Sequence, residues 1–284
     1  MAPPHFPGRR PSIWRAIVLQ VAALLVFVGV IYAIERFVQP EFTPTTLLLT
    51  SLVMALVPAG IWLAFFYQQD RVEPEPLSYV LGVFALGALL AAAVGIPLEE
   101  DVFRTGQWLY ADPLTTLLGG ILVVGFIEEF LKYAAVRYSV YHSAEYDEPT
   151  DGVIYAVAAG LGYATVLNIH FALTDGGVSL GVGELRMVVE AMAQASFAGI
   201  TGYFLGRAKF ENEPIWWMPL GITLSATANG VFNWLRGQVT QGGFSVAGAA
   251  ANPWLGLLLA ALVALAVTGL VSWLINHSQR AAGH

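Results

Sequence analysis

The sequence predicts an all-α membrane protein, a polytopic bundle of about eight transmembrane helices with both termini in the cytoplasm. Three observations predict this fold. Apolar residues make up 57% of the chain and charged residues only 12%, and the mean hydropathy of +0.65 is far above that of a soluble domain. The apolar residues form eight runs, and a hydrocarbon core needs roughly 20 such residues per helix. Tryptophans lie near the ends of several runs, where an amphipathic ring prefers the membrane interface.

The eight predicted spans are separated by short connections that contain charged residues, proline or other turn formers. Basic residues precede the first span, an acidic loop with prolines separates the second from the third, and Arg137 ends the fourth. An acidic string, 145–151, precedes the fifth span, basic residues end the sixth, Pro214 begins the seventh, and alanine and leucine dominate the eighth. The predicted spans are 14–34, 46–67, 77–97, 114–137, 152–173, 186–208, 214–235 and 254–276.

These spans form a single membrane domain, 14–276, whose polar-lined helices cover about 114–236. Residues 1–13 are expected to be a disordered cytoplasmic tail and 277–284 a second cytoplasmic tail, and no connection is long enough for a soluble domain. Lysine and arginine prefer the cytoplasmic flanks of spans. An N-terminus inside the cell places most of them there, among them Arg10, Arg71, Lys132, Arg137, Arg207 and Lys209.

Composition excludes two classes of site. The chain has no cysteine, which excludes disulfides and thiolate metal sites. It has no basic patch with interleaved aromatic residues, so we expect no nucleic-acid partner. The expected surroundings are the lipid bilayer.

Polar side chains at membrane depth are concentrated in the fourth to seventh predicted spans. An ionisable residue in the bilayer interior costs about 3 kcal/mol or more, so it usually faces other helices, has a partner and serves a function. Residues three or four apart share a helix face. Each span therefore presents a polar face to a shared cavity, formed by Glu128, Glu129 and Lys132, by Asn168 and His170, by Glu190 and Gln194, and by Asn229 and Asn233.

The adjacent pair Glu128 and Glu129 is the strongest candidate for chemistry. Lys132 alone cannot cheaply neutralise two adjacent buried carboxylates, and a carboxylate in this situation is a candidate general base. For single amide residues, hydrogen bonding between helices is an equally good interpretation. These residues are Asn168, Gln194 and Asn233.

Residues 125–132, Gly-Phe-Ile-Glu-Glu-Phe-Leu-Lys, resemble the Glu-Glu-x-x-Lys motif of the PrsW-type intramembrane proteases, which are related to the CAAX prenyl endopeptidases. The strings DRVEPEP (70–76) and DEPTDGVIYAVAAGLGYATVLN (147–168) are similar to loops and a helix of that family. So are RMVVEAMAQASFAGITGYFLGRAKF (186–210) and NGVFNWL (229–235). The resemblance covers most of the chain from 70 to 236, and its motifs agree in order and spacing.

The resemblance implies a protease of the bacterial plasma membrane that cleaves a membrane-anchored protein or transmembrane segment, such as an anti-sigma factor. It implies that Glu128 and Glu129 are the paired catalytic glutamates and that Lys132 closes their motif. Amide side chains on the neighbouring spans would then hydrogen-bond a developing oxyanion. These candidates are Gln194, Asn229 and Asn233.

Three positions depart from the family's pattern. The resemblance aligns Leu167 with a glutamate of the family, and Gln194 and Asn229 with histidines. Zinc, the cofactor that the resemblance leads us to expect, usually takes three ligands from His, Asp or Glu and keeps one position for water. The usual ligand set is therefore incomplete. The remaining candidate ligands are Glu129, His170 and Glu190.

Depth in the membrane separates these candidates. A rise of about 1.5 Å per residue places His170 and Glu190 about 5 Å from the outer ends of their helices, and Glu128 about 21 Å from its own. We therefore expect His170 and Glu190 to form an ion pair near the outer interface. The same count places Gln194 and Asn229 about 10 Å from the outer side, so their convergence with Glu128 requires tilted helices or shifted boundaries.

Three functions remain open from the sequence. The first is a peptidase in which a glutamate activates water without a metal. The second is a catalytically inactive homologue that binds transmembrane segments without cutting them. The third is a transporter or channel that uses the buried carboxylates as an ion site, although the interrupted helices and inverted repeat typical of transporters are not evident in the sequence.

Overall fold

Every regular element in the described part of the chain is helical. The computed structural model describes residues 13–69, 75–174, 180–240 and 253–282. The α-helices are α1 (Ile13–Phe37), α2 (Pro44–Gln69), α3 (Leu77–Leu90), α4 (Pro113–Gly119), α5 (Phe126–Arg137), α6 (Asp151–Thr174), α7 (Leu180–Phe210), α8 (Trp217–Thr240) and α9 (Pro253–Ala282). Three π-helical segments, η1 (Ala91–Gly95), η2 (Leu98–Val102) and η4 (Gly120–Gly125), and a 3₁₀ turn, η3 (Thr105–Gln107), complete the set.

Within the described ranges the helices join into eight rods, because α3 continues through η1 and η2, and α4 continues through η4 into α5. The all-α prediction is confirmed, and each predicted run lies in one rod, except that residues 214–216 of the seventh run precede α8. By length and apolar composition, four helices qualify as membrane spans among the described residues: Pro44–Tyr67, Leu77–Gln107, Pro113–Arg137 and Asp151–Thr174. The predicted N-terminal tail lies, except for Ile13, outside the described residues, and α9 continues to Ala282.

The predicted end of the third span at Pro97 is wrong. Pro97 has helical backbone angles and directly precedes η2, so the rod extends to Val102. Proline lacks the N–H that an α-helical bond requires, and π-helical turns on both sides accommodate that loss. The extension carries an acidic string, Glu99–Glu100–Asp101, past the predicted helix end.

Helix α6 forms the centre of the bundle, since its residues 151–165 are all buried. It packs closely on α3 through glycines. A Cβ at Gly162 would lie 1.9 Å from the carbonyl oxygen of Phe84, and one at Gly87 would lie 2.2 Å from that of Ala159. Such backbone contact favours helix association in lipid, where apolar burial gives little driving force.

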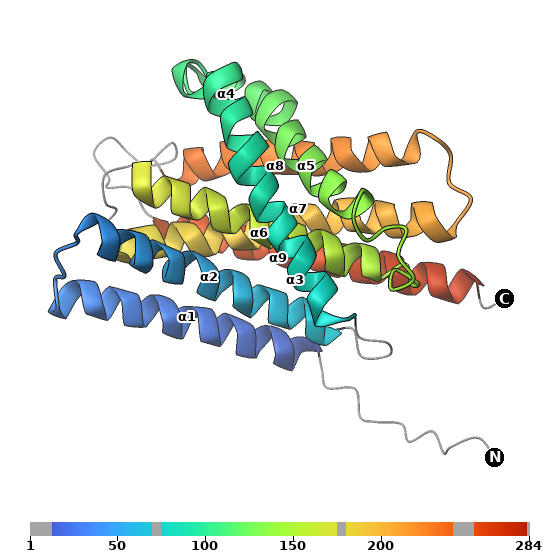
Figure 1. Ribbon diagram of the computed structural model, residues 1–284, viewed down its shortest axis with the longest axis horizontal. Helices are drawn as coiled ribbons and strands as arrows, with labels where there is room; N and C mark the ends of the chain where they lie inside the picture. The colour runs from blue at the N-terminus through green and yellow to red at the C-terminus, as the bar shows by residue number, and fades with distance from the viewer. Residues whose placement is uncertain (1–12, 70–74, 175–179, 241–252, 283–284) are drawn as a thin grey trace, which may run out of the picture.

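Two rods cross the others at an angle. Figure 1 shows α3 and the α4–α5 rod running obliquely across the remaining long helices, which lie roughly side by side. The start of α1 and the end of α9 lie at the same end of the bundle, together with the end of α5, the end of α7 and the start of α8. The oblique path of α5 determines which residues it brings to its neighbours.

Candidate active site

Two adjacent carboxylates, Glu128 and Glu129, lie in the first turn of α5, directly after the π-helical segment η4. Both residues are buried, with 3% and 0% of their surface exposed. The end of η4 packs tightly against α8, because a Cβ at Gly125 would lie 2.5 Å from the carbonyl oxygen of Ala226. This close approach places the first turn of α5 against the polar face of α8.

Both oxygens of Glu129 are engaged. Its Oε1 accepts hydrogen bonds from Lys132 Nζ at 2.5 Å and from Asn229 Nδ2 at 3.1 Å. Its Oε2 accepts one from Ser225 Oγ at 2.7 Å. Lys132 is itself fully buried, so its ammonium compensates the charge of this carboxylate inside the bundle.

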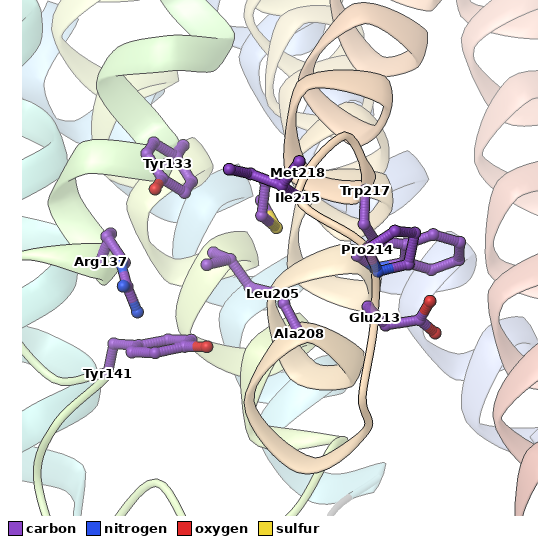
Figure 2. Close-up of a pocket in the computed structure, with 10 residues that line it drawn as sticks. All are labelled: Tyr133, Arg137, Tyr141, Leu205, Ala208, Glu213, Pro214, Ile215, Trp217 and Met218. Atoms are coloured by element: carbon purple, nitrogen blue, oxygen red, sulfur yellow. The ribbon is translucent and has the colours of Figure 1, made fainter.

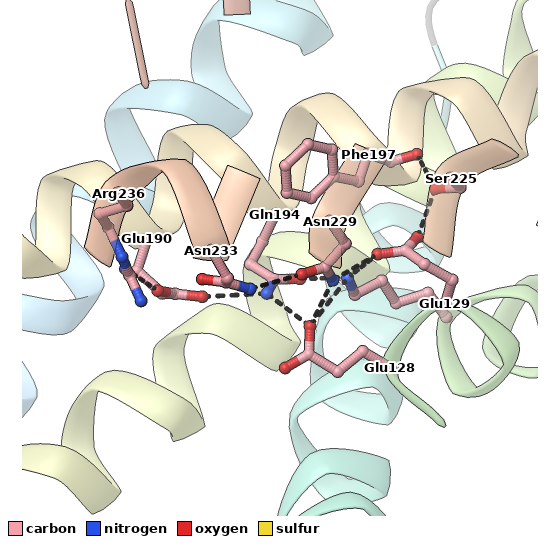
Figure 3. A network of polar contacts seen from close by, with 10 residues as sticks. Glu128, Glu129, Glu190, Gln194, Phe197, Ser225, Asn229, Asn233 and Arg236 are labelled. Carbon is pink, nitrogen blue, oxygen red and sulfur yellow. Dashed lines mark hydrogen bonds and ion pairs between the residues drawn. The ribbon is translucent and has the colours of Figure 1, made fainter. Parts of the chain in front are cut away.

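Glu128 is engaged on one oxygen only. Its Oε2 accepts hydrogen bonds from Gln194 Nε2 and Asn229 Nδ2, both at 2.7 Å, and lies 3.8 Å from Lys132 Nζ. In Figure 3 the other oxygen points away from the network, and no described residue donates a hydrogen bond to it. The two glutamates therefore differ, since Glu128 alone keeps an oxygen that can accept a further proton donor.

The network continues along α7 and α8 (Figure 3). Gln194 accepts a hydrogen bond from Lys132 and donates one to Glu190 at 2.9 Å. Asn233 Nδ2 donates to Asn229 Oδ1 at 2.7 Å. The structure therefore brings all six residues predicted for the catalytic site into one network: Glu128, Glu129, Lys132, Gln194, Asn229 and Asn233.

Gln194 and Asn229 reach Glu128 because the helices are tilted, although residue counts along straight helices place them at different depths. Because α5 crosses α7 and α8 obliquely (Figure 1), equal distances along the helices do not correspond to equal depths in the bundle. Lys132, counted at the sequence level among the cytoplasmic basic residues, is instead buried within the bundle. Its place is determined by its carboxylate and amide partners.

A family model described as "PrsW family intramembrane metalloprotease" matches residues 75–267, more than half of the chain. This chain belongs to the PrsW family. It is 32% identical over 187 residues to the protease PrsW of Geobacillus kaustophilus, covering 65% of this chain and 79% of that protein. To the protease PrsW of Bacillus subtilis it is 28% identical over 193 residues, covering 64% and 83%. No solved structure matches the chain.

Membership in the PrsW family and the apolar helices agree on location. The family is described as one of intramembrane metalloproteases, and four described helices are long and apolar enough to cross a bilayer. The chain is an integral bacterial membrane protein, as predicted.

The site does not fit the zinc that the PrsW family's description leads us to expect. Its side chains are carboxylates, amides, a serine hydroxyl and an ammonium, and no histidine of the described residues takes part. The ammonium of Lys132, 2.5 Å from Glu129 and 3.8 Å from Glu128, already supplies a cation between the carboxylates. Leu167 lies among apolar side chains near Leu131 and adds no ligand.

The predicted ion pair between His170 and Glu190 is wrong. His170 Nε2 lies 2.7 Å from Glu100 Oε1, and Glu190 Oε2 lies 2.8 Å from Arg236 Nη1. The helical extension beyond Pro97 carries Glu100 to the end of α6, where Glu100 pairs with His170 in place of Glu190. His170 and Glu190 therefore do not combine with Glu129 into a metal site.

Two polar residues near the site were missed at the sequence level. Ser225 lies four residues before Asn229, on the same face of α8, but serine is too common in helices to stand out. Glu99 lies in η2, beyond the predicted end of the third span at Pro97. Its Oε1 is buried without a hydrogen-bond partner among the described residues.

Asn168 has the structural role that the sequence left open. Its Nδ2 donates a hydrogen bond to the carbonyl oxygen of Met187 at 3.1 Å, which ties α6 to α7. Among the described residues, no hydrogen bond joins it to the network around Glu128.

Proposed function

We propose that this PrsW-family protein is an intramembrane peptidase that works without zinc, with Glu128 as the general base. The observation that carries the proposal is the asymmetry of the pair. Glu128 Oε1 accepts no hydrogen bond from a described residue, whereas both oxygens of Glu129 are engaged. A general base needs a free lone pair that can accept a proton from water, and Glu128 Oε1 provides one.

In the proposed reaction, Glu128 Oε1 takes a proton from water while the water oxygen forms a bond to the carbonyl carbon of the scissile peptide. The same carboxyl then returns the proton to the leaving nitrogen as the carbon–nitrogen bond breaks. Asn229 and Gln194 hold the other oxygen of Glu128 in place. Asn233 uses one of its two amide hydrogens on Asn229 and can direct the second to the oxyanion.

The proposed substrate is a membrane-anchored protein, such as an anti-sigma factor, because the site lies inside a helical bundle and the matching family is described as one of intramembrane metalloproteases. We further propose eight spans with both termini in the cytoplasm. This topology is supported by the start of α1 and the end of α9 at one end of the bundle, where Arg137, Arg207 and Lys209 also lie.

The test is cleavage of a membrane-anchored reporter by the purified protein in liposomes. We expect Glu128→Gln to lower the rate about 10²–10⁴-fold, the usual contribution of a general base. Glu100→Gln is the matched control, because Glu100 is a half-exposed carboxylate outside the network. Elemental analysis of the same sample should find no stoichiometric zinc. Unchanged cleavage by Glu128→Gln, or one zinc per chain, would contradict the proposal.

A second candidate is a non-catalytic PrsW homologue that binds transmembrane segments. A specific observation favours it: both amide hydrogens of Asn229 and of Gln194 are already donated to carboxylates. Few donors then remain for an oxyanion. This candidate predicts that a transmembrane segment co-purifies equally with the wild-type protein and with Glu128→Gln, and that neither cleaves it.

A further inference from the structure

A cavity of about 200 Å³ lies outside the network, at the end of the bundle where α5 and α7 end and α8 begins (Figure 2). In Figure 2, Tyr133, Arg137 and Tyr141 form one wall, and the segment from Glu213 to Met218 forms the other. Neither proposed function uses this cavity. Its walls combine a cation, phenols and apolar side chains.

The cation of the cavity is not neutralised by a protein carboxylate. Among the described residues, no carboxylate lies within ion-pair distance of Arg137, whereas Glu213, the one acidic residue in the wall, pairs with Arg207 at 2.6 Å. The Arg137 guanidinium lies 4.0 Å from the centroid of the Tyr141 ring. Stacking on an aromatic face fixes the plane of a guanidinium, whose five N–H groups can serve an anion as well as the neighbouring phenols.

The phenols of Tyr133 and Tyr141 line the cavity. A phenol keeps its proton at neutral pH because its ordinary pKa is about 10, and burial raises the pKa of Tyr141 further. Each is therefore a neutral hydrogen-bond donor beside Arg137. A guanidinium with two nearby hydroxyl donors suits a phosphate oxygen, because Arg binds phosphate through two parallel hydrogen bonds.

Exposed apolar side chains at the rim of the cavity indicate which kind of molecule would carry that phosphate. Ile215, which lines the cavity, is 96% exposed, and its neighbour Trp216 is 57% exposed. In an integral membrane protein, exposed apolar and tryptophan side chains at a helix end contact the lipid interface. A phosphate that reaches Arg137 past this rim is thus carried by a molecule with an apolar part.

We propose that this cavity binds the phosphate of an anionic phospholipid, with Arg137 and the two phenols on the phosphate and Ile215 and Trp216 against the acyl chains. The proposal is independent of catalysis at Glu128. Free phosphate shares the headgroup chemistry but has no part for the rim to contact.

The experiment measures binding to the purified protein in detergent by the shift in its unfolding temperature. The probes are short-chain phosphatidylglycerol, short-chain phosphatidylcholine and inorganic phosphate. We expect phosphatidylglycerol to stabilise the wild-type protein and Arg137→Gln to weaken its affinity about tenfold or more, the worth of a charged hydrogen bond. Arg36→Gln is the matched control, since it removes an equal charge from an exposed position on α1.

Two further variants separate the sources of the anion and guard against a folding defect. Arg137→Lys keeps the charge but loses the planar fork, and it should also weaken phosphatidylglycerol binding. Ile215→Ser should weaken binding of the lipid and leave that of inorganic phosphate unchanged. The proposal is overturned if Arg36→Gln and Arg137→Gln weaken binding equally, if phosphatidylcholine binds as tightly as phosphatidylglycerol, or if inorganic phosphate stabilises as much as the lipid.

Discussion

Lys132 Nζ lies 2.5 Å from Glu129 Oε1, three residues earlier on α5, and neither side chain is accessible to solvent. The pair links α5 to both neighbouring helices, because Lys132 also bonds Gln194 on α7 while Glu129 bonds Ser225 and Asn229 on α8. Such a pair contributes specificity more than net stability, but the loss of one partner leaves a buried charge.

The loss of Lys132 should therefore be severe. We expect Lys132→Met to destabilise the protein by about 3–5 kcal/mol, because two buried carboxylates lose their cation while side-chain volume is nearly conserved. Unfolding in detergent, followed by circular dichroism, measures the change. The double variant Lys132→Met with Glu129→Gln removes a negative charge as well, and should recover much of the loss. Equal stability of single and double variants would argue against charge compensation.

Ser225 should matter through Glu129. Ser225→Ala removes the donor to Glu129 Oε2, and we expect a loss of about 1–3 kcal/mol, the range for a hydrogen bond to a charged group. Thr223→Ala is the control on α8, since its hydroxyl is exposed and bonds only within its own helix. The Ser225 hydroxyl has only one hydrogen to donate, and Glu129 Oε2 shares it with the carbonyl oxygen of Phe197, which lies 2.6 Å from Ser225 Oγ. Equal losses in the two variants would mean that Glu129 does not depend on this donor.

The packing of α6 on α3 predicts opposite effects for two glycines. Gly162→Ala would place a methyl group 1.9 Å from a backbone oxygen, so the helices must separate, at a cost of about 1–3 kcal/mol. Gly82, in the interior of α3, has no atom within 4 Å of the added methyl. Gly82→Ala should be neutral or stabilise by about 0.5–1 kcal/mol through helix propensity. Thermal unfolding of the two variants gives the comparison, and a destabilised Gly82→Ala would contradict it.

Much of this architecture is readable from the sequence, because run length and spacing carry the signal. The fourth run, 114–137, is the α4–α5 rod within one residue, and spacing of four correctly grouped Glu128 with Lys132. What could not be read depends on helix direction and local irregularity. Helices drawn without tilt do not bring Gln194 to Glu128. Pro97 suggested the end of a helix, so the sequence did not predict that the helix continues to Glu99 and Glu100.

The partner of His170 leads to the last prediction. The side chains of His170 and Glu100 are 30% and 55% exposed. Their pairing should contribute no more than about 1 kcal/mol to stability, because solvent screens the attraction. We expect His170→Gln to change stability by less than this and to leave the metal content and reporter cleavage of the protein unaltered. Glu190→Gln is the informative comparison, since Glu190 is nearly buried and joins Arg236 to Gln194. It should destabilise the protein more, because removing its charge leaves Arg236 partly uncompensated. A loss of reporter cleavage in His170→Gln would restore His170 to the active site.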